Sequence, residues 1–130
     1  MTPALKQRIE ETRTTVFKVV FPNTTNHYDT LFGGTAMQLM DEVAFITATR
    51  FCRKKVVTIS SGRIDFKEAI PADTITELTG EVVDIGHTSL TVNVTIAQEN
   101  MYADNTQKQS ISGEFTFVAL NEDNKPTAIL

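Results

Sequence analysis

The stretch from Pro22 to Ala44, PNTTNHYDTLFGGTAMQLMDEVA, carries most of the information in this 130-residue chain. A polar loop ends in Gly33-Gly34, and an apolar helix follows it. Backbone N–H groups at such a helix start favour developing negative charge. Asp41 lies about two turns into the helix, at a position where a core residue is expected. Together these features predict a small active site that stabilises an oxyanion and activates water.

Asp41 allows two interpretations. Its helical neighbours three, four and seven positions away are all apolar, namely Met37, Ala44, Phe45 and Ala48. Burying a carboxylate among them is costly unless it is paired or hydrogen-bonded. A structural role would have Asp41 bond a backbone group, or a cation across an interface. A functional role would have it serve as general base for water, and the nearby glycine pair favours this role.

The other polar residues of the loop are open to structural roles as well. Asn26 either caps its own backbone in a turn or belongs to the site. Gly33-Gly34 is either a flexible helix entry or a place where a carbonyl approaches backbone N–H groups closely. Glu42 points elsewhere on the helix and is expected at a surface or interface. His27 and His87 have no metal-ligand spacing around them and form no convincing triad, so no metal site is expected.

Outside this stretch, the alternation of apolar and polar residues predicts a β-rich chain. Residues 14–21 are typical of a strand. Residues 35–51 are apolar over most of the helical circumference, so we expect a largely buried helix. Further strands are expected at 56–66, 74–85, 89–96 and 111–119, followed by a polar tail over 121–130. In the first of these strands the apolar parity switches, which predicts a bulge near Gly62.

This order of elements predicts an α+β fold. A five-stranded antiparallel sheet can bury one long helix on one of its faces. A single sheet cannot cover a helix that is apolar nearly all round. We therefore expect a partner subunit to cover the remaining helix surface.

Length and composition predict one domain over residues 1–130. The formal net charge is −4, and the densest basic cluster, Arg53-Lys54-Lys55, is expected to be a solvated turn, so no nucleic-acid partner is expected. Residues 1–15 are polar and mixed in charge, and no segment resembles a signal peptide or a membrane span. Cys52 is the single cysteine and is expected to pack in the core, which fits a cytoplasmic location.

Five groups of residues together resemble the hotdog-fold acyl-CoA thioesterases, and more narrowly the cytosolic acyl-CoA hydrolase branch with its YciA-like enzymes. The resemblance covers about residues 14–128. The groups are Asn26-x5-Phe32-Gly33-Gly34-x6-Asp41, Val56-Val57-Thr58, Asp65-Phe66-x4-Pro71-x-Asp73, Gly86-His87-Thr88-Ser89 and Glu114 to Ala119.

The resemblance implies a single hotdog domain that hydrolyses acyl-CoA to a free fatty acid and coenzyme A, with no separate cofactor. It implies a dimer with one continuous sheet, assembled further as a trimer of dimers. Asn26 of one subunit would face Asp41 and Thr58 of the other, and the N–H groups around Gly33-Gly34 would polarise the thioester carbonyl. Asp41 would activate water or attack the thioester directly. Arg63, Thr88 and Ser89 resemble positions where relatives hold coenzyme A.

The chain also departs from the family. Many relatives have a glycine shortly before Phe-Gly-Gly, where this chain has Tyr28-Asp29-Thr30, so the loop is expected to bind or gate differently. A second hotdog domain and a long C-terminal extension are not expected. The alternatives are a hotdog dehydratase, for which His27 is a poor candidate, a non-catalytic acyl-CoA sensor, and a purely structural oligomer.

Overall fold

The structure is a computed structural model, and it describes residues 1–104 and 106–130. Within these ranges the chain forms two α-helices, a short 3-10 helix and six strands. In order they are α1 (Pro3–Glu11), β1 (Thr14–Val19), η1 (Pro22–Thr24), α2 (Gly33–Cys52), β2 (Lys55–Ser61), β3 (Asp65–Phe66), β4 (Thr74–Ile85), β5 (Ser89–Asn100) and β6 (Lys108–Leu120).

The strands form one antiparallel sheet in the order β1-β4-β5-β6-β2, and the two-residue strand β3 pairs with β6. Inward residues alternate with outward residues along β4, β5 and β6. Such alternation is typical of antiparallel strands with one face on a core. The predicted strand 74–85 is confirmed at both ends, whereas β5 and β6 extend beyond the predicted 89–96 and 111–119.

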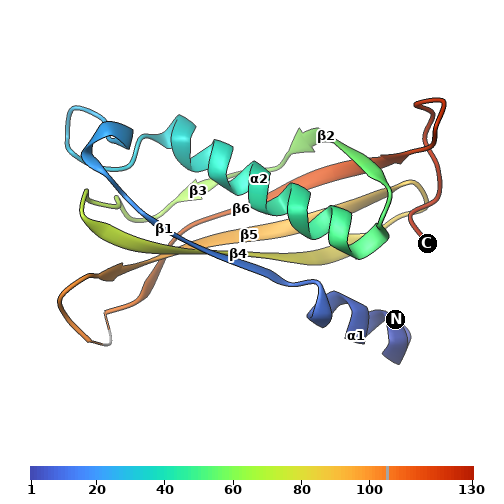
Figure 1. Cartoon of the computed structure of the whole chain (residues 1–130), viewed down its shortest axis with the longest axis horizontal. Helices are drawn as coiled ribbons and strands as arrows, with labels where there is room; N and C mark the ends of the chain where they lie inside the picture. Colours follow the sequence, from blue (N-terminus) through green and yellow to red (C-terminus); the bar gives the residue numbers. More distant parts are fainter. Residues whose placement is uncertain (105) are drawn as a thin grey trace.

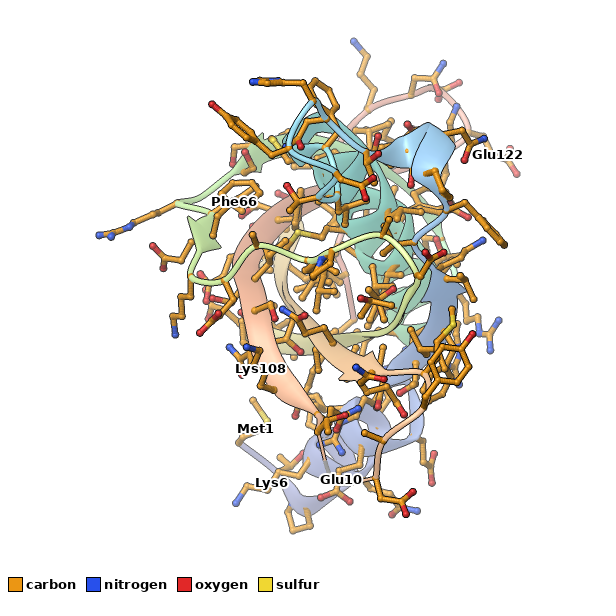
Figure 2. The ribbon with its side chains drawn as sticks, turned by 90° about the vertical axis from the view of Figure 1, so that its left-hand side faces the viewer. Met1, Lys6, Glu10, Phe66, Lys108 and Glu122 are labelled. Atoms are coloured by element: carbon orange, nitrogen blue, oxygen red, sulfur yellow. The ribbon has the colours of Figure 1, made fainter. Side chains whose placement is uncertain are left out.

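Helix α2 lies in the concave face of the sheet and runs roughly along the strands (Figure 1). Seen from the end, the sheet curves around the helix (Figure 2). The two layers lie close together at Gly80 of β4. A Cβ at Gly80 would lie 2.5 Å from Thr47 Oγ1 and 3.1 Å from Val43 Cγ1, so a glycine is needed for the helix to approach this far.

One face of α2 is not covered by the sheet. Met37 and Phe45 keep 41% and 46% of their surface exposed, and Asp41 lies half-buried between them. Gly34 and Gln38 are exposed on the same side. These five residues form the open face of α2. The helix is therefore less buried than predicted, and its open face is the surface for which a covering partner was expected.

The second predicted strand is wrong in its continuity. The strand stops after Ser61 and resumes as β3. The register shifts between Thr58 and Ser60, so one bulged residue is Ile59, three positions before the predicted bulge near Gly62. A second extra residue lies in the break over 62–64. Ser61 pairs with Phe115 and Asp65 pairs with Ser112, so the chain advances four residues from β2 to β3 while β6 advances three. Two insertions of one residue replace the single predicted bulge.

Both ends of the chain are more ordered than predicted. Helix α1 was not expected; the Thr2 side chain accepts a hydrogen bond from Leu5 N at 3.2 Å, and a proline opens the helix. Ile9 of this helix is buried. The predicted polar tail also folds back, because Ile129 is buried and its N–H donates to the His87 carbonyl at 2.9 Å. Helix α2 begins at Gly33, so the glycine pair forms its first turn.

Candidate functional site

The structure brings together two of the predicted site residues, Asp41 and Thr58. The Thr58 hydroxyl donates a hydrogen bond to Asp41 Oδ1 at 2.9 Å, and this bond joins α2 to β2. Thr58 directly precedes the bulge at Ile59. Bulges are frequent beside active sites, where they redirect a side chain or end the pairing. The carboxylate is thus held at one oxygen by a neutral donor, and its second oxygen is left for another partner.

The Asp41–Thr58 pair lies in an open depression of about 450 Å³, here called the Asp41 depression. Its wall is formed by α2 on one side and by β2 on the other, with Gly34, Met37, Asp41, Thr58, Ile59 and Phe115 among its lining residues. The apolar and polar lining together suits a ligand with an apolar part and a polar reacting group.

The N-terminus of α2 opens into this depression through Gly34. The helix cap residue, Phe32, makes no side-chain capping bond, and the first intrahelical bond runs from Ala36 N to the Phe32 carbonyl. The N–H groups of Gly33, Gly34 and Thr35 have no acceptor among the described residues. A Cβ at Gly34 would meet the Phe32 ring at 2.8 Å. A glycine at this position therefore leaves space for the Phe32 ring.

Asn26 does not meet Asp41 within the chain. Its Oδ1 accepts hydrogen bonds from Tyr28 N at 2.9 Å, Thr30 N at 3.2 Å and Thr30 Oγ1 at 3.1 Å. The predicted turn-capping role is thus confirmed. These bonds orient the side-chain amide, and its Nδ2 group has no partner among the described residues. Asn26 lines a second depression of about 280 Å³, the Asn26 depression, which also includes Gly33.

The backbone of the Asn26 loop accommodates Tyr28-Asp29-Thr30, the residues that stand where many relatives have a glycine. Asp29 has a φ of 62°, in the left-handed region that favours glycine. Asp tolerates this conformation better than most residues because its short polar side chain bonds locally. The Asp29 carbonyl accepts from Ala72 N at 3.0 Å, so the loop is tied to the segment before β4. An aspartate therefore occupies the kind of conformation for which a glycine is usually chosen.

The predicted coenzyme A residues are not brought together within one chain. Arg63 lies in the break between β2 and β3 and pairs with Asp65 at 2.7 Å. Thr88 and Ser89 lie at the start of β5, where the Thr88 carbonyl accepts from Ala119 N. Ser89 pairs with Val118 of β6, whereas Gly62, next to Arg63, bonds to Glu114 of the same strand, and the joint role of these residues stays a prediction.

The remaining sequence candidates lie outside both depressions. His27 is exposed and stacks on Tyr28 with ring centroids 4.0 Å apart. Cys52 is buried, as expected of a packing residue, and Glu42 is exposed, as expected of a surface charge. Within the described ranges no group of three or more His, Cys, Asp or Glu side chains is placed to hold a metal ion.

Sequence reasoning missed three polar residues of the Asp41 depression, namely Gln38, Ser60 and Ser61. Gln38 lies three positions before Asp41, a spacing that brings it to the same helix face. Ser60 and Ser61 follow Thr58 directly, and the bulge at Ile59 decides where they point. The helical spacing could have identified Gln38 from the sequence, whereas the position of the bulge at Ile59 could not be predicted from it.

A long helix held in a curved antiparallel sheet is the hotdog fold, and solved hotdog structures superimpose closely on this chain. The chain belongs to the Thioesterase superfamily, whose family model matches residues 28–103, more than half of its length. No helix in the described part of the chain combines the length and hydropathy needed to cross a membrane.

The chain is similar in sequence to curated acyl-CoA thioester hydrolases and in structure to solved acyl-CoA hydrolases. It is 36% identical over 110 residues, 85% of its length, to the uncharacterized acyl-CoA thioester hydrolase YkhA of Bacillus subtilis. It is 29% identical over 123 residues, 93% of its length, to the cytosolic acyl coenzyme A thioester hydrolase of Rattus norvegicus. The chain spans 63% of the first relative's length and 32% of the second's.

An acyl-CoA hydrolase from Staphylococcus aureus, solved with butyryl coenzyme A, coenzyme A and coenzyme A disulfide, is 34% identical. Its TM-score is 0.88 over 92% of this chain and 73% of that chain. Alanine variants of one asparagine, one aspartate and one threonine of that enzyme have been solved, spaced by 15 and 17 residues along its chain. Asn26, Asp41 and Thr58 have the same spacing here (41 − 26 = 15 and 58 − 41 = 17). An apo-hexameric acyl-CoA thioesterase has the same TM-score of 0.88 at 33% identity, over 92% of this chain and 76% of that chain.

Proposed function

We propose that this protein hydrolyses acyl-CoA thioesters to free fatty acids and coenzyme A. The observation that carries the proposal is the Asp41–Thr58 pair in a depression into which the N-terminus of α2 opens. A carboxylate for water and donors for an oxyanion are the two components that thioester hydrolysis requires. The coenzyme A complexes of the Staphylococcus aureus enzyme support the choice of substrate class.

In the proposed reaction, Asp41 takes a proton from water as the water attacks the thioester carbonyl. The carbonyl oxygen gains negative charge, which the N–H groups at the start of α2 stabilise. The carbon–sulfur bond then breaks, and the thiolate of coenzyme A leaves and takes up the proton. A direct attack by Asp41, which would form an anhydride that water then cleaves, uses the same residues. Either route is complete without a cofactor, so we propose that none is used.

Asn26 requires a second subunit in this proposal. Within one chain it lines a different depression from Asp41, and its free Nδ2 group is available as a donor. We propose that Asn26 of one subunit reaches Asp41 and Thr58 of the other, where it positions the water or binds the carbonyl. Arg63, Thr88 and Ser89 remain proposed contacts of coenzyme A.

The proposed dimer joins two sheets at β2. This strand ends the sheet, so one of its edges has no neighbour among the residues that the structure describes. Val57 and Ile59 on β2 are exposed, as are Met37 and Phe45 on the open face of α2. An unpaired strand edge beside exposed apolar residues is a surface that folded proteins usually cover. The apo-hexameric relative supports further assembly, which we propose is a trimer of dimers.

We propose a cytoplasmic location, which the printed name of the rat relative supports. The rival functions find less support in the geometry. A dehydratase would use a loop histidine, but His27 stacks on Tyr28 and lines neither depression. A sensor would not need the Asp41–Thr58 pair, and a structural oligomer would gain nothing from it.

The test is thiol release from acyl-CoAs of increasing chain length, from acetyl to palmitoyl, by wild type and Asp41→Asn. We expect release by wild type and at least a hundredfold loss in the variant, because the amide cannot act as a base. Circular dichroism controls for folding. Wild-type binding without release of any chain length would move the assignment to the sensor, and a variant that keeps most activity would refute the role of Asp41.

A further inference from the structure

Two buried polar residues, Gln98 of β5 and Ser110 of β6, interrupt the apolar residues that point from these strands into the core. The inward residues of β5 are Leu90, Val92, Val94 and Ile96, and the next inward residue is Gln98, which is 7% exposed. On the neighbouring strand, Ser110 is completely buried. A buried amide or hydroxyl costs free energy unless its hydrogen bonds are made. The pair therefore needs a physical reason.

Ser110 is the extra residue of a bulge in β6. Ile96 pairs with Ile111 and Ala97 pairs with Gln109, so Ser110 has no opposite residue on β5. Ser110 and Ile111 are both buried although they are consecutive, which breaks the alternation of the strand. The bulge thus turns the Ser110 side chain inward, toward Gln98.

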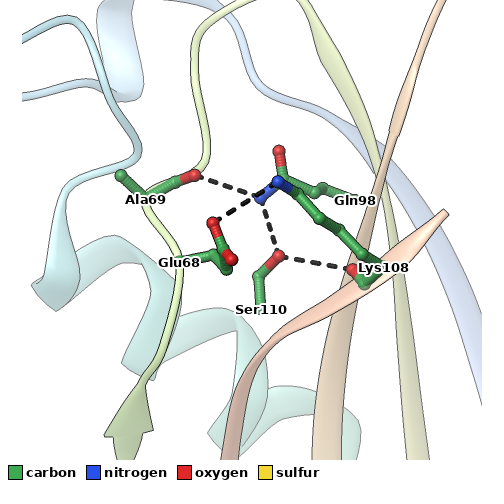
Figure 3. Close-up of polar contacts among 5 residues, drawn as sticks. All are labelled: Glu68, Ala69, Gln98, Lys108 and Ser110. Atoms are coloured by element: carbon green, nitrogen blue, oxygen red, sulfur yellow. Dashed lines mark hydrogen bonds and ion pairs between the residues drawn. The ribbon is translucent and has the colours of Figure 1, made fainter. Parts of the chain in front are cut away.

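The amide nitrogen of Gln98 is fully used. It donates to Ser110 Oγ at 2.7 Å and to the Ala69 carbonyl at 3.0 Å, and the Ser110 hydroxyl donates to the Lys108 carbonyl at 3.3 Å (Figure 3). The Lys108–Glu68 ion pair, at 3.4 Å, lies beside these hydrogen bonds (Figure 3). It is exposed and contributes little by itself.

The bulge also holds the segment before β4 by its backbone. The Ser110 carbonyl accepts from Lys67 N at 2.9 Å and from Glu68 N at 3.2 Å. With the bond from Gln98 to Ala69, three consecutive residues of the segment are fixed to the sheet. Four residues of this stretch line the Asn26 depression, namely Phe66, Glu68, Ala69 and Ile70.

The next bonds run from this segment to the Asn26 loop. Leu31 N donates to the Ile70 carbonyl at 2.7 Å, and Ala72 N donates to the Asp29 carbonyl at 3.0 Å. Thr30 forms an antiparallel bridge with Pro71. Thr30 is also the residue that holds the Asn26 side chain. Hydrogen bonds joined by two peptide linkages, Ala69–Ile70 and Thr30–Leu31, therefore lead from Gln98 to Asn26.

We propose that Gln98 and Ser110 form a buried latch that positions the Asn26 loop. This inference rests on the proposed function for the role of Asn26 in hydrolysis, while the latch itself rests on the contacts above. Gln98 and Ser110 touch no substrate and are positioning residues. An apolar pair at these positions would leave the Ala69 carbonyl without its donor, and only the backbone bonds from Lys67 and Glu68 would still hold the segment to β6.

Amide hydrogen exchange on the whole chain tests the latch without reference to activity. In Gln98→Leu we expect the amides of Leu31 and Ala72 to exchange about tenfold faster, while Val92 and Val94 in β5 change less than twofold. Gln107→Leu is the matched control, because Gln107 loses an exposed bond to Glu77 and should change none of these rates. Ser110→Ala is a milder variant, expected to accelerate the same amides about threefold.

Loop amides that exchange at the wild-type rate in folded Gln98→Leu would overturn the latch. So would an equal acceleration in the loop and in β5, which would mean general destabilisation. If Gln98→Leu does not fold, the same criteria apply to Ser110→Ala.

Kinetics then separates the latch from the proposed function. Gln98→Leu should lower kcat about tenfold in the wild-type background and less than twofold when combined with Asn26→Ala. An equal loss in both backgrounds would refute positioning through Asn26. A wild type without hydrolysis would refute the proposed function, and the exchange rates would still decide the latch.

Discussion

Thr58→Val removes the hydroxyl that holds Asp41 and keeps the shape of the side chain. Valine is β-branched like threonine, so it suits strand β2 equally well. Thr58 Oγ1 donates to Asp41 Oδ1 at 2.9 Å, a bond from a neutral donor to a carboxylate. If the proposed reaction is correct, this bond orients the carboxylate toward water, and its loss should lower the rate.

The size of the effect follows from the type of bond and its exposure. A hydrogen bond to a charged group contributes about 1.5–3 kcal/mol. Thr58 is exposed, so in the free protein water replaces the hydroxyl, and the free energy of unfolding should fall by less than about 1 kcal/mol. If the orienting effect is fully expressed in the transition state, kcat falls about 10- to 150-fold.

The assay compares wild type, Thr58→Val and Thr58→Ser by thiol release, with urea unfolding of each protein. Thr58→Ser keeps the hydroxyl and should retain kcat within about threefold. A Thr58→Val variant with wild-type kcat would refute the argument that this bond orients Asp41. Equal losses in the valine and serine variants would assign the effect to packing at β2.

Two further predictions concern packing and assembly. Gly80→Ala should lower the free energy of unfolding by about 1–3 kcal/mol, because its Cβ would lie 2.5 Å from Thr47 Oγ1. Gly62→Ala is the control: the nearest neighbours of its Cβ lie at 3.8 Å, so the free energy of unfolding should change by less than about 0.5 kcal/mol. Urea unfolding measures both variants. Phe45→Glu on the open face of α2 should shift the protein toward monomer, as measured by light scattering. Tyr102→Glu is the control, because Tyr102 is 91% exposed and its replacement should leave the mass unchanged. An unchanged mass for Phe45→Glu would place the interface elsewhere.

The sequence predicted the bounds of a strand best where turn residues flank it. The bounds of β4 were found because turns at Pro71 and Gly86 flank it, although its alternation is less regular than that of residues 89–96, where the predicted strand ended too early. Helix α1 was missed because it is mostly polar and buries only Ile9, so its periodic signal is weak. The burial of Ile129 was missed for a related reason: one apolar residue in a polar tail does not indicate where the chain returns.

The site was predictable in its residue types and only partly in its geometry. Asp41 was found as a carboxylate on an apolar helix face. Its contact with Thr58 depends on how α2 crosses β2, which no spacing of 17 residues reveals, and the family resemblance supplied that pairing. The place of Asn26 beside a partner's Asp41 depends on assembly and stays a prediction. Arg63 and Thr88 came from the resemblance alone, and the protomer keeps them apart.

Two irregular positions of the sheet lie beside the proposed site, whereas the register shift at Val83 of β4 lies outside both depressions. Ile59 is bulged beside Thr58, and Ser110 is bulged beside the segment that supports the Asn26 loop. Asp29 takes a left-handed conformation within that loop. Each irregularity interrupts a regular pattern and weakens the sheet or strains the backbone locally. Thr58 still pairs in regular register with Phe117 and has the same strand parity as buried Val56, so alternation alone directs it toward α2. Ser110 differs, because the bulge is what turns its side chain toward Gln98. At Ile59 and Ser110, the breaks in regular pairing therefore mark positions that bear on the proposed function.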